Sequence, residues 1–141
     1  MTPAFFYHRD DKKKAIKSEL FLENSSFLCG QSGYTYQNFN VDDHNVHKLS
    51  KSIQRVFELV NIKRCQIGLS RLEVLKVELN SYAHAKNISY HPIPKVDKEP
   101  FYWLINKNFK YSKALKNLIN KEINELINTK KMQKFYKKYN L

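Results

Sequence analysis

Short apolar runs alternate with amphipathic stretches along most of this chain, and that order limits the folds open to it. Four runs have the length and apolar character of buried strands: "SSFLCG" at 25–30, "RCQIGLS" at 64–70, "ISYHPIP" at 88–94 and "PFYWLINK" at 100–107. Apolar residues at helical spacing predict amphipathic helices over 42–60, 71–86 and 112–128, with a further short one in "MQKFYKKY". This alternation predicts an α/β fold with a parallel-rich sheet flanked by helices.

The length and composition of the chain indicate one ordinary core. With 141 residues, 42% of them hydrophobic, and only three glycines and four prolines, the chain is apolar enough to fold. We expect an N-terminal extended segment over 1–20, an α/β lobe over 21–106 and a C-terminal helical tail over 107–141. The sequence has no run of about 18 uncharged apolar residues, so we expect no transmembrane segment.

The net charge of +12 favours an anionic partner, but the kind of charge weakens that inference. Only four of the 25 basic residues are arginine, the residue that recognises bases and phosphates in a bidentate way. Lysine and asparagine both have AT-rich codons, so genome composition alone would produce this charge. A small basic nucleic-acid-binding protein is therefore the alternative interpretation, and a solvated basic face is the preferred one.

The stretch "FLCGQSGYTYQNF" places two of the three glycines, Gly30 and Gly33, directly after a predicted strand. Glycine allows a sharp bend there, and the free amides at the start of a following helix form a natural anion site. Ser32 and Thr35 add hydroxyl groups beside the bend. The pattern lacks the third glycine or the Gly-Lys-Ser/Thr ending of known phosphate loops, so a turn that simply needs small residues is the competing interpretation.

Taken in order, the segments carry a resemblance to a known family. The turn Gly-x-x-Gly-Tyr-Thr-Tyr is followed by "NIKRCQIGL", "ISYHPIP", "PFYWLINKN" and the helical pair "ALKNLINKEINELINTKKMQKFYKKY". Over about residues 20 to 141 this resembles the C-terminal part of the type II periplasmic solute-binding proteins that serve polar amino-acid ABC transporters. The resemblance implies a non-catalytic binding lobe without a cofactor, in which the glycine-threonine turn holds the carboxylate of the solute.

The resemblance also implies a site and a ligand class. We expect the solute to contact Ser32, Gly33, Tyr34, Thr35 and Tyr36, together with Arg71. The aspartate that pairs with a ligand amino group in the family falls near "LSRLE", where this chain has Ser70, Arg71 and Leu72. An ammonium group would find no carboxylate in that stretch, and Arg71 suits an anionic group better.

Family members are commonly close to twice this length, and this chain begins about where the crossover to the second lobe would start. It therefore looks like a truncated member with reduced or lost binding. An ABC permease is one partner that the resemblance implies, and self-association through uncovered apolar surface is another expectation. The resemblance implies the periplasm, whereas the absence of a signal peptide at Met1 would leave the chain in the cytoplasm if Met1 is the true start.

Two other pairs of residues have a chemical and a plain structural interpretation. His44 and His47 would lie one helical turn apart and can share a metal, but Asp42 or Asp43 at a helix start is more commonly a cap. Cys29 and Cys65 need a histidine to act as nucleophiles, and two inert core cysteines are the preferred interpretation. If their strands lie side by side the thiols could approach, and oxidation would then depend on the compartment. No acid, base and nucleophile converge in the sequence, so we expect no enzyme.

Aromatic residues near the turn and in the last apolar run are a possible stacking surface. Most of them are expected in the core, with Tyr34 or Tyr36 on the ligand side; the full set is Tyr34, Tyr36, Phe39, Phe101, Tyr102 and Trp103. The tail carries ten lysines against Glu122 and Glu125. Its regular apolar stripe favours a docked helix whose lysines face solvent.

Overall fold

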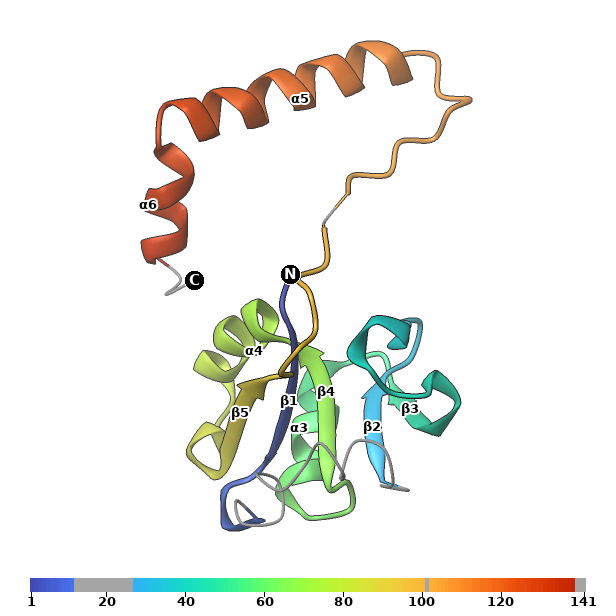
Figure 1. Cartoon of the computed structure of the whole chain (residues 1–141), viewed down its shortest axis with the longest axis vertical. Helices are drawn as coiled ribbons and strands as arrows, with labels where there is room; N and C mark the ends of the chain where they lie inside the picture. Colours follow the sequence, from blue (N-terminus) through green and yellow to red (C-terminus); the bar gives the residue numbers. More distant parts are fainter. Residues whose placement is uncertain (12–26, 101, 139–141) are drawn as a thin grey trace. The chain divides into compact units, whose positions relative to one another are not determined.

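The computed structural model describes residues 1–11, 27–100 and 102–138. The chain divides into two compact units, the first ending at Pro100 and the second comprising the residues beyond it. Figure 1 shows a twisted sheet with helices in the first unit, and the second unit contains α5 (Ser112–Asn128) and α6 (Lys131–Lys138). No helix in the described ranges is long and apolar enough to cross a membrane.

The first unit is built on a five-stranded sheet with the order β3-β2-β4-β1-β5. Strand β2 pairs in parallel with β3 and β4, whereas β1 pairs antiparallel with β4 and β5. Four strands therefore run in one direction and β1 alone runs against them, which confirms the α/β class. The strands are β1 (Pro3–His8), β2 (Leu28–Gln31), β3 (Val46–Ser50), β4 (Ile67–Arg71) and β5 (Ile88–Pro92).

Strand β1 lies inside the sheet, and its sequence PAFFYH explains why. Successive side chains of a strand point to opposite faces, so Ala4 and Phe6 enter one core while Phe5 and Tyr7 enter the other. Both faces are covered, which is why an uninterrupted apolar run suits this position. The extended segment expected at the start of the chain is thus a buried strand of the sheet.

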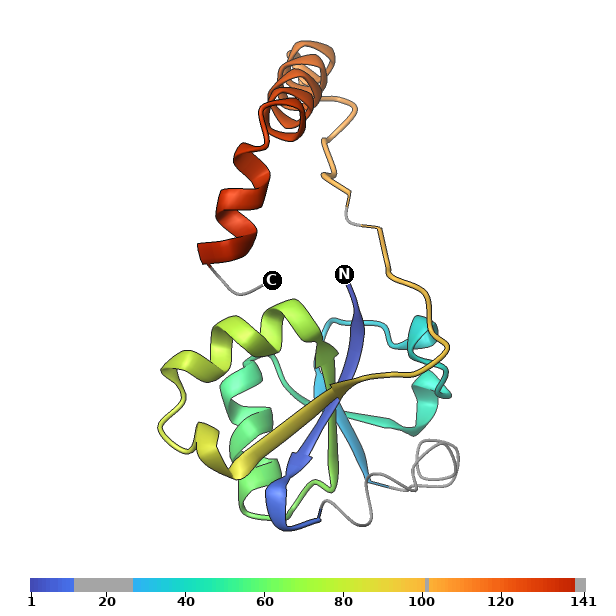
Figure 2. The same cartoon turned by 60° about the vertical axis from the view of Figure 1, so that its left-hand side comes forward.

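Helices α3 (Ile53–Asn61) and α4 (Leu72–Glu78) cover one face of the sheet (Figure 2). Their apolar positions pack with β1 and with both cysteines in the first core: Ile53, Val56, Phe57, Val60, Leu75 and Leu79. Connecting segments cover the other face, where Tyr36, Phe39 and Ile93 pack on β1, β2 and β4. The sequence periodicity of both helices therefore marks the residues that are buried.

The helix predicted over 42–60 is wrong in its first half. A 3-10 turn at Asp43–Asn45 leads into β3, and α3 begins only after Ser52. Val46 and Leu49 have helical spacing, but Val46 is buried in the strand, paired with Leu28 of β2, while Leu49 is 53% exposed. Pairing with β2 satisfies the backbone of this short segment, so tertiary contacts override the local pattern.

The helix predicted over 71–86 is shorter than expected, since α4 ends at Glu78 and a 3-10 turn continues it to Ser81. The strand predicted over 100–107 is wrong in the described part, because residues 102–106 have no regular structure. There Tyr102 is 73% exposed and Leu104 96% exposed. These apolar residues lie outside the two cores of the first unit.

The helical tail matches its prediction closely. Helix α5 spans Ser112–Asn128 and α6 spans Lys131–Lys138. Between them Lys130 has a left-handed φ of 56°, a conformation that commonly ends a helix. No described side chain of either helix is buried, and the apolar stripe of α5 includes the exposed Leu118 and Ile127.

Candidate anion-binding edge of the sheet

The candidate site lies at one end of the strands, where β2, β3 and β4 have their C-termini. This end of the strands is the binding edge of the sheet. From β2 the chain passes to β3 on one side, and β4 then lies on the other side of β2. Ligands of α/β sheets usually bind outside the carboxyl ends of the strands, at such a switch in direction. The turn that follows β2 occupies this position.

Gly33 forms the bend that the sequence predicts. Its φ is +86°, a conformation that only glycine adopts without strain, and a β-carbon there would meet no atom within 4 Å. No α-helix follows the bend, because the chain continues into a 3-10 turn at Gln37–Phe39. The expected amides of a helix N-terminus are therefore absent from this turn, and the backbone donors near the bend are those of the turn itself.

The amides of this turn fall into two groups. Three amides are used by the fold: the Gln31 amide donates to the Tyr36 hydroxyl at 2.6 Å, and the Ser32 amide donates to the Ser50 carbonyl at 2.7 Å. The Tyr36 amide donates to Asp43 Oδ1 at 2.8 Å. The amides of Gly33, Tyr34 and Thr35 make no hydrogen bond with any described residue. Three consecutive donors at the tip of the turn thus remain available to a ligand.

Two of the predicted site residues are used by the fold. The Ser32 hydroxyl donates to the Lys48 carbonyl at 2.8 Å, which fixes the turn on β3. Tyr36 is 1% exposed, and its burial raises the pKa of its hydroxyl above the usual value. Thr35 and Tyr34 are exposed beside the free amides.

Arg71 ends β4 at the same edge, and it already has a partner. Its Nε donates to Glu99 Oε2 at 2.6 Å, and the two side chains are only 16% and 13% exposed. The guanidinium carbon lies 5.7 Å from the centre of the Tyr34 ring and 5.3 Å from that of Phe39, within cation-π range. The terminal amino groups of Arg71 make no hydrogen bond with the described residues, so their four N–H donors have no partner among those residues.

Sequence reasoning missed Glu99, which follows β5 and is 28 residues from Arg71. No motif marks it. The Glu99 amide donates to the Met1 carbonyl at 2.6 Å, so the segment after β5 lies against the start of β1. Only the position of β1 between β4 and β5 brings these segments together.

Glu73, at the start of α4, fixes the beginning of β1 at this edge. Its carboxylate accepts the Thr2 amide at 2.9 and 3.1 Å and the Thr2 hydroxyl at 2.9 Å. Partial burial raises the pKa of Glu73, but the hydrogen bonds from Thr2 and from its own amide, together with the N-terminal charge, outweigh burial and lower the pKa. Glu73 is therefore an ionised structural anchor in the neutral range.

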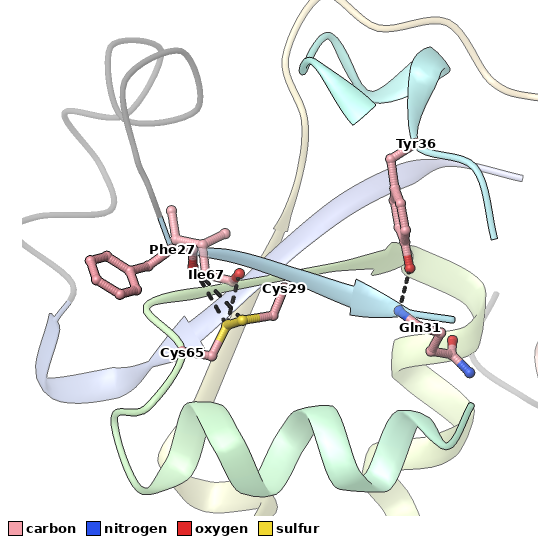
Figure 3. The surroundings of a disulfide bond; sticks show 6 residues. All are labelled: Phe27, Cys29, Gln31, Tyr36, Cys65 and Ile67. Carbon is pink, nitrogen blue, oxygen red and sulfur yellow. Dashed lines mark hydrogen bonds between the residues drawn. A yellow bond between two sulfur atoms is a disulfide. The ribbon is translucent and has the colours of Figure 1, made fainter. Parts of the chain in front are cut away.

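Cys29 and Cys65 form a disulfide bond (Figure 3). Both residues are buried, and the bond joins β2 to the segment just before β4. The core position expected for both cysteines is thus confirmed, and their bond is the oxidised alternative, which required the two strands to lie side by side. A closed disulfide also removes the thiolate that nucleophilic catalysis would need.

The histidine pair does not form a metal site. His44 lies in a 3-10 turn capped by Asp42, and His47 lies in β3, so the two do not share a helical turn. Asp43 instead accepts the Lys48 ammonium at 2.7 Å. Within the described ranges, no three His, Cys, Asp or Glu side chains converge as metal ligands.

The aromatic residues of the predicted stacking surface do not lie together: some are in the core and others are exposed. Tyr36 and Phe39 are core residues that pack edge to face, with ring centres 5.1 Å apart. Tyr34 alone of the turn aromatics is exposed, at 48%. Tyr102 and Trp103 are exposed in the second unit, and Phe101 lies outside the described residues.

Neither a family model nor a curated protein matches this chain.

Proposed function

We propose that this chain is a non-catalytic binding lobe for a small anionic solute, of the kind found in type II solute-binding proteins of ABC transporters. The observation that carries the proposal is the group of free amides at Gly33, Tyr34 and Thr35 beside the Arg71 guanidinium. Amide donors and a planar guanidinium fork both suit a carboxylate or phosphate group. Ser32 and Tyr36 support the turn rather than contact the solute.

The path of the chain also supports a lobe that works with a second one. Pro3 of β1 pairs with Arg71, and Ala4 pairs with Pro92. The start of β1 and the end of β5 are therefore at the same edge as the candidate site (Figure 1). In a two-lobe protein the connections cross at the cleft, where the solute is held from both sides. One lobe alone would bind weakly, because it supplies only part of the contacts.

The disulfide bears on the compartment of this proposed function. Such bonds persist in oxidising compartments, including the bacterial periplasm, and are rare in the cytosol. A buried cystine therefore supports an exported protein. An ABC permease is the partner that such a lobe would serve, and the exposed apolar stripe of α5 is the surface through which self-association would occur.

Backbone NMR titration with acetate and inorganic phosphate tests the proposal. Either anion should shift the amide signals of Gly33, Tyr34 and Thr35 in a saturable way, and Arg71→Gln should abolish the shift. Thr35→Ala should weaken binding by about 1 to 3 kcal/mol if its hydroxyl donates to the anion. Arg55→Gln is the matched control, because Arg55 is an exposed arginine that pairs with Glu58 on α3. Shifts spread over the lysine-rich surface, or none at all, would contradict the proposal.

A nucleic-acid-binding role is the alternative, and the exposure of the tail lysines favours it. All ten lysines between 107 and 138 are exposed. Nonspecific nucleic-acid binding falls steeply with salt in proportion to the phosphates contacted. Filter binding of duplex DNA and of RNA at two salt concentrations separates this role from solute binding.

A further inference from the structure

The ion pair between Arg71 and Glu99 places an intrachain carboxylate inside the proposed binding edge. We infer that Glu99 sets the charge specificity of this edge, so that it accepts solutes with one negative charge and disfavours those with two. This inference rests on the proposed function. It concerns a residue that the sequence pattern did not identify and that contacts Arg71 directly.

One donor of the Arg71 guanidinium is occupied by Glu99, and the terminal amino groups are available to a solute. Glu99 uses the Nε donor, and the side chain is held by the rings of Tyr34 and Phe39. An incoming carboxylate therefore meets the terminal amino groups of a guanidinium whose position is already fixed. Fixing the fork in advance lowers the ordering cost of binding.

The same contact changes the net charge at the edge. Glu99 balances the single positive charge of Arg71. The Met1 ammonium, which donates to the Glu99 carbonyl, is balanced in turn by Glu73, the carboxylate that lies two residues after Arg71 and accepts the Thr2 amide. One anionic group on the solute can bind the amides of Gly33 to Thr35 and the free part of the guanidinium. A second anionic group would have no further positive charge from Arg71 and would be repelled by Glu99.

Low exposure makes the repulsion effective. The Arg71 and Glu99 side chains are 16% and 13% exposed, so solvent and salt screen them less than they screen surface charges. The segment that carries Glu99 is attached through its amide to the Met1 carbonyl, and Ile93 earlier in the segment donates to the Pro3 carbonyl at 3.0 Å. The carboxylate is thus held in place by backbone bonds as well as by the ion pair.

Two solutes of nearly equal size isolate the effect of charge: succinate and its monomethyl ester. The full chain should bind monomethyl succinate about tenfold more tightly than succinate at neutral pH, the effect of one like-charge contact at partly buried positions. Glu99→Gln keeps the shape of the side chain and removes its charge. This variant should lose the preference for the monoanion.

Asp97→Asn is the matched control, because Asp97 is exposed two residues from Glu99 and undergoes the same change in charge. It should keep the preference, and Glu99→Asp should restore most of it. Circular dichroism verifies folding of each variant, and the preference of the unmodified chain decides the matter if Glu99→Gln does not fold.

Binding titrations of each chain with succinate and with monomethyl succinate have outcomes that decide the inference. Loss of the preference in Glu99→Gln alone supports the inference. An unmodified chain that binds both solutes equally, or prefers succinate, overturns it while leaving solute binding intact, and so does a Glu99→Gln chain that keeps the preference. A chain that binds neither solute overturns the proposed function, and this inference with it.

Discussion

The hydroxyl of Tyr36 accepts the backbone amide hydrogen of Gln31 at 2.6 Å, so the turn after β2 is closed around its own tyrosine (Figure 3). The ring lies over Gly30, where a β-carbon would come within 2.4 Å of the ring atoms. The first glycine of the turn therefore makes room for Tyr36, while the second supplies the bend. This arrangement positions the tip of the turn, which carries the free amides.

Removing the Tyr36 hydroxyl should destabilise the first unit. Tyr36→Phe leaves the partly buried Gln31 amide without its acceptor, which should lower the free energy of unfolding by about 1 to 3 kcal/mol. Urea unfolding followed by circular dichroism measures the change. Tyr34→Phe is the control, since Tyr34 is exposed and should change stability little. Equal effects of the two substitutions would contradict the structural role of the Tyr36 hydroxyl.

Reducing the disulfide should also destabilise the fold. The bond closes a loop with a sequence separation of 36 residues, and the loss of this constraint on the unfolded chain corresponds to about 3 to 4 kcal/mol. Urea unfolding with and without reductant should show a difference of this size. The double variant Cys29→Ser with Cys65→Ser should unfold like the reduced chain and should not respond to reductant. Identical transitions for the oxidised and reduced chain would show that the bond has no stabilising role.

Local periodicity predicts an element correctly where its apolar spacing fits only one kind of secondary structure. Helix α5 was predicted over the same residues that it occupies, because its apolar spacing continues over 17 residues. Strand β5 lies within its predicted apolar run, and β2 and β4 each extend one residue beyond theirs. Val46 and Leu49 satisfy helical spacing by chance and so predict helix where β3 forms, because pairing with β2 decides the structure there.

The candidate site, too, can be predicted only in part from the sequence. The bend at Gly33 follows from residue type, since the conformation there requires glycine. Which amides are occupied does not follow, because the acceptors Tyr36, Asp43 and Ser50 are brought to the turn by the fold. Glu99 reaches Arg71 for the same kind of reason, and one sequence contains no signal for an ion pair across 28 residues.

Asp43 should make stability depend on pH in the acid range. Its hydrogen bond from the Lys48 ammonium, with a further bond from the Tyr36 amide, lowers its pKa in the folded protein. Because the folded pKa lies below the unfolded value of about 3.9, the stabilising contribution is present above that pH. It is lost as pH falls through the folded pKa.

The variant Asp43→Asn tests this dependence. It should be less stable than the unmodified chain at pH 7, and the difference should shrink as pH falls below about 4. Urea unfolding at a series of pH values measures both effects, with Asp97→Asn as a control at an exposed carboxylate. A difference in stability that stays constant from pH 7 to pH 2 would show that the charge of Asp43 does not contribute.

Deleting the tail should leave the first unit folded. Both cores are formed by residues between Ala4 and Val96, and no described side chain of α5 or α6 is buried. A chain ending at Pro100 should therefore unfold with a free energy within about 0.5 kcal/mol of that of the full chain, as expected for changes away from the core.

A shorter chain ending at Pro92 is the matched comparison. It loses Ile93, which is 5% exposed and donates to the Pro3 carbonyl, and it also loses Glu99, the partner of Arg71. This second deletion should lower stability by several kcal/mol, through lost apolar burial and the unpaired, largely buried Arg71. Equal losses in the two truncated chains would mean that the helical tail contributes to the stability of the sheet unit.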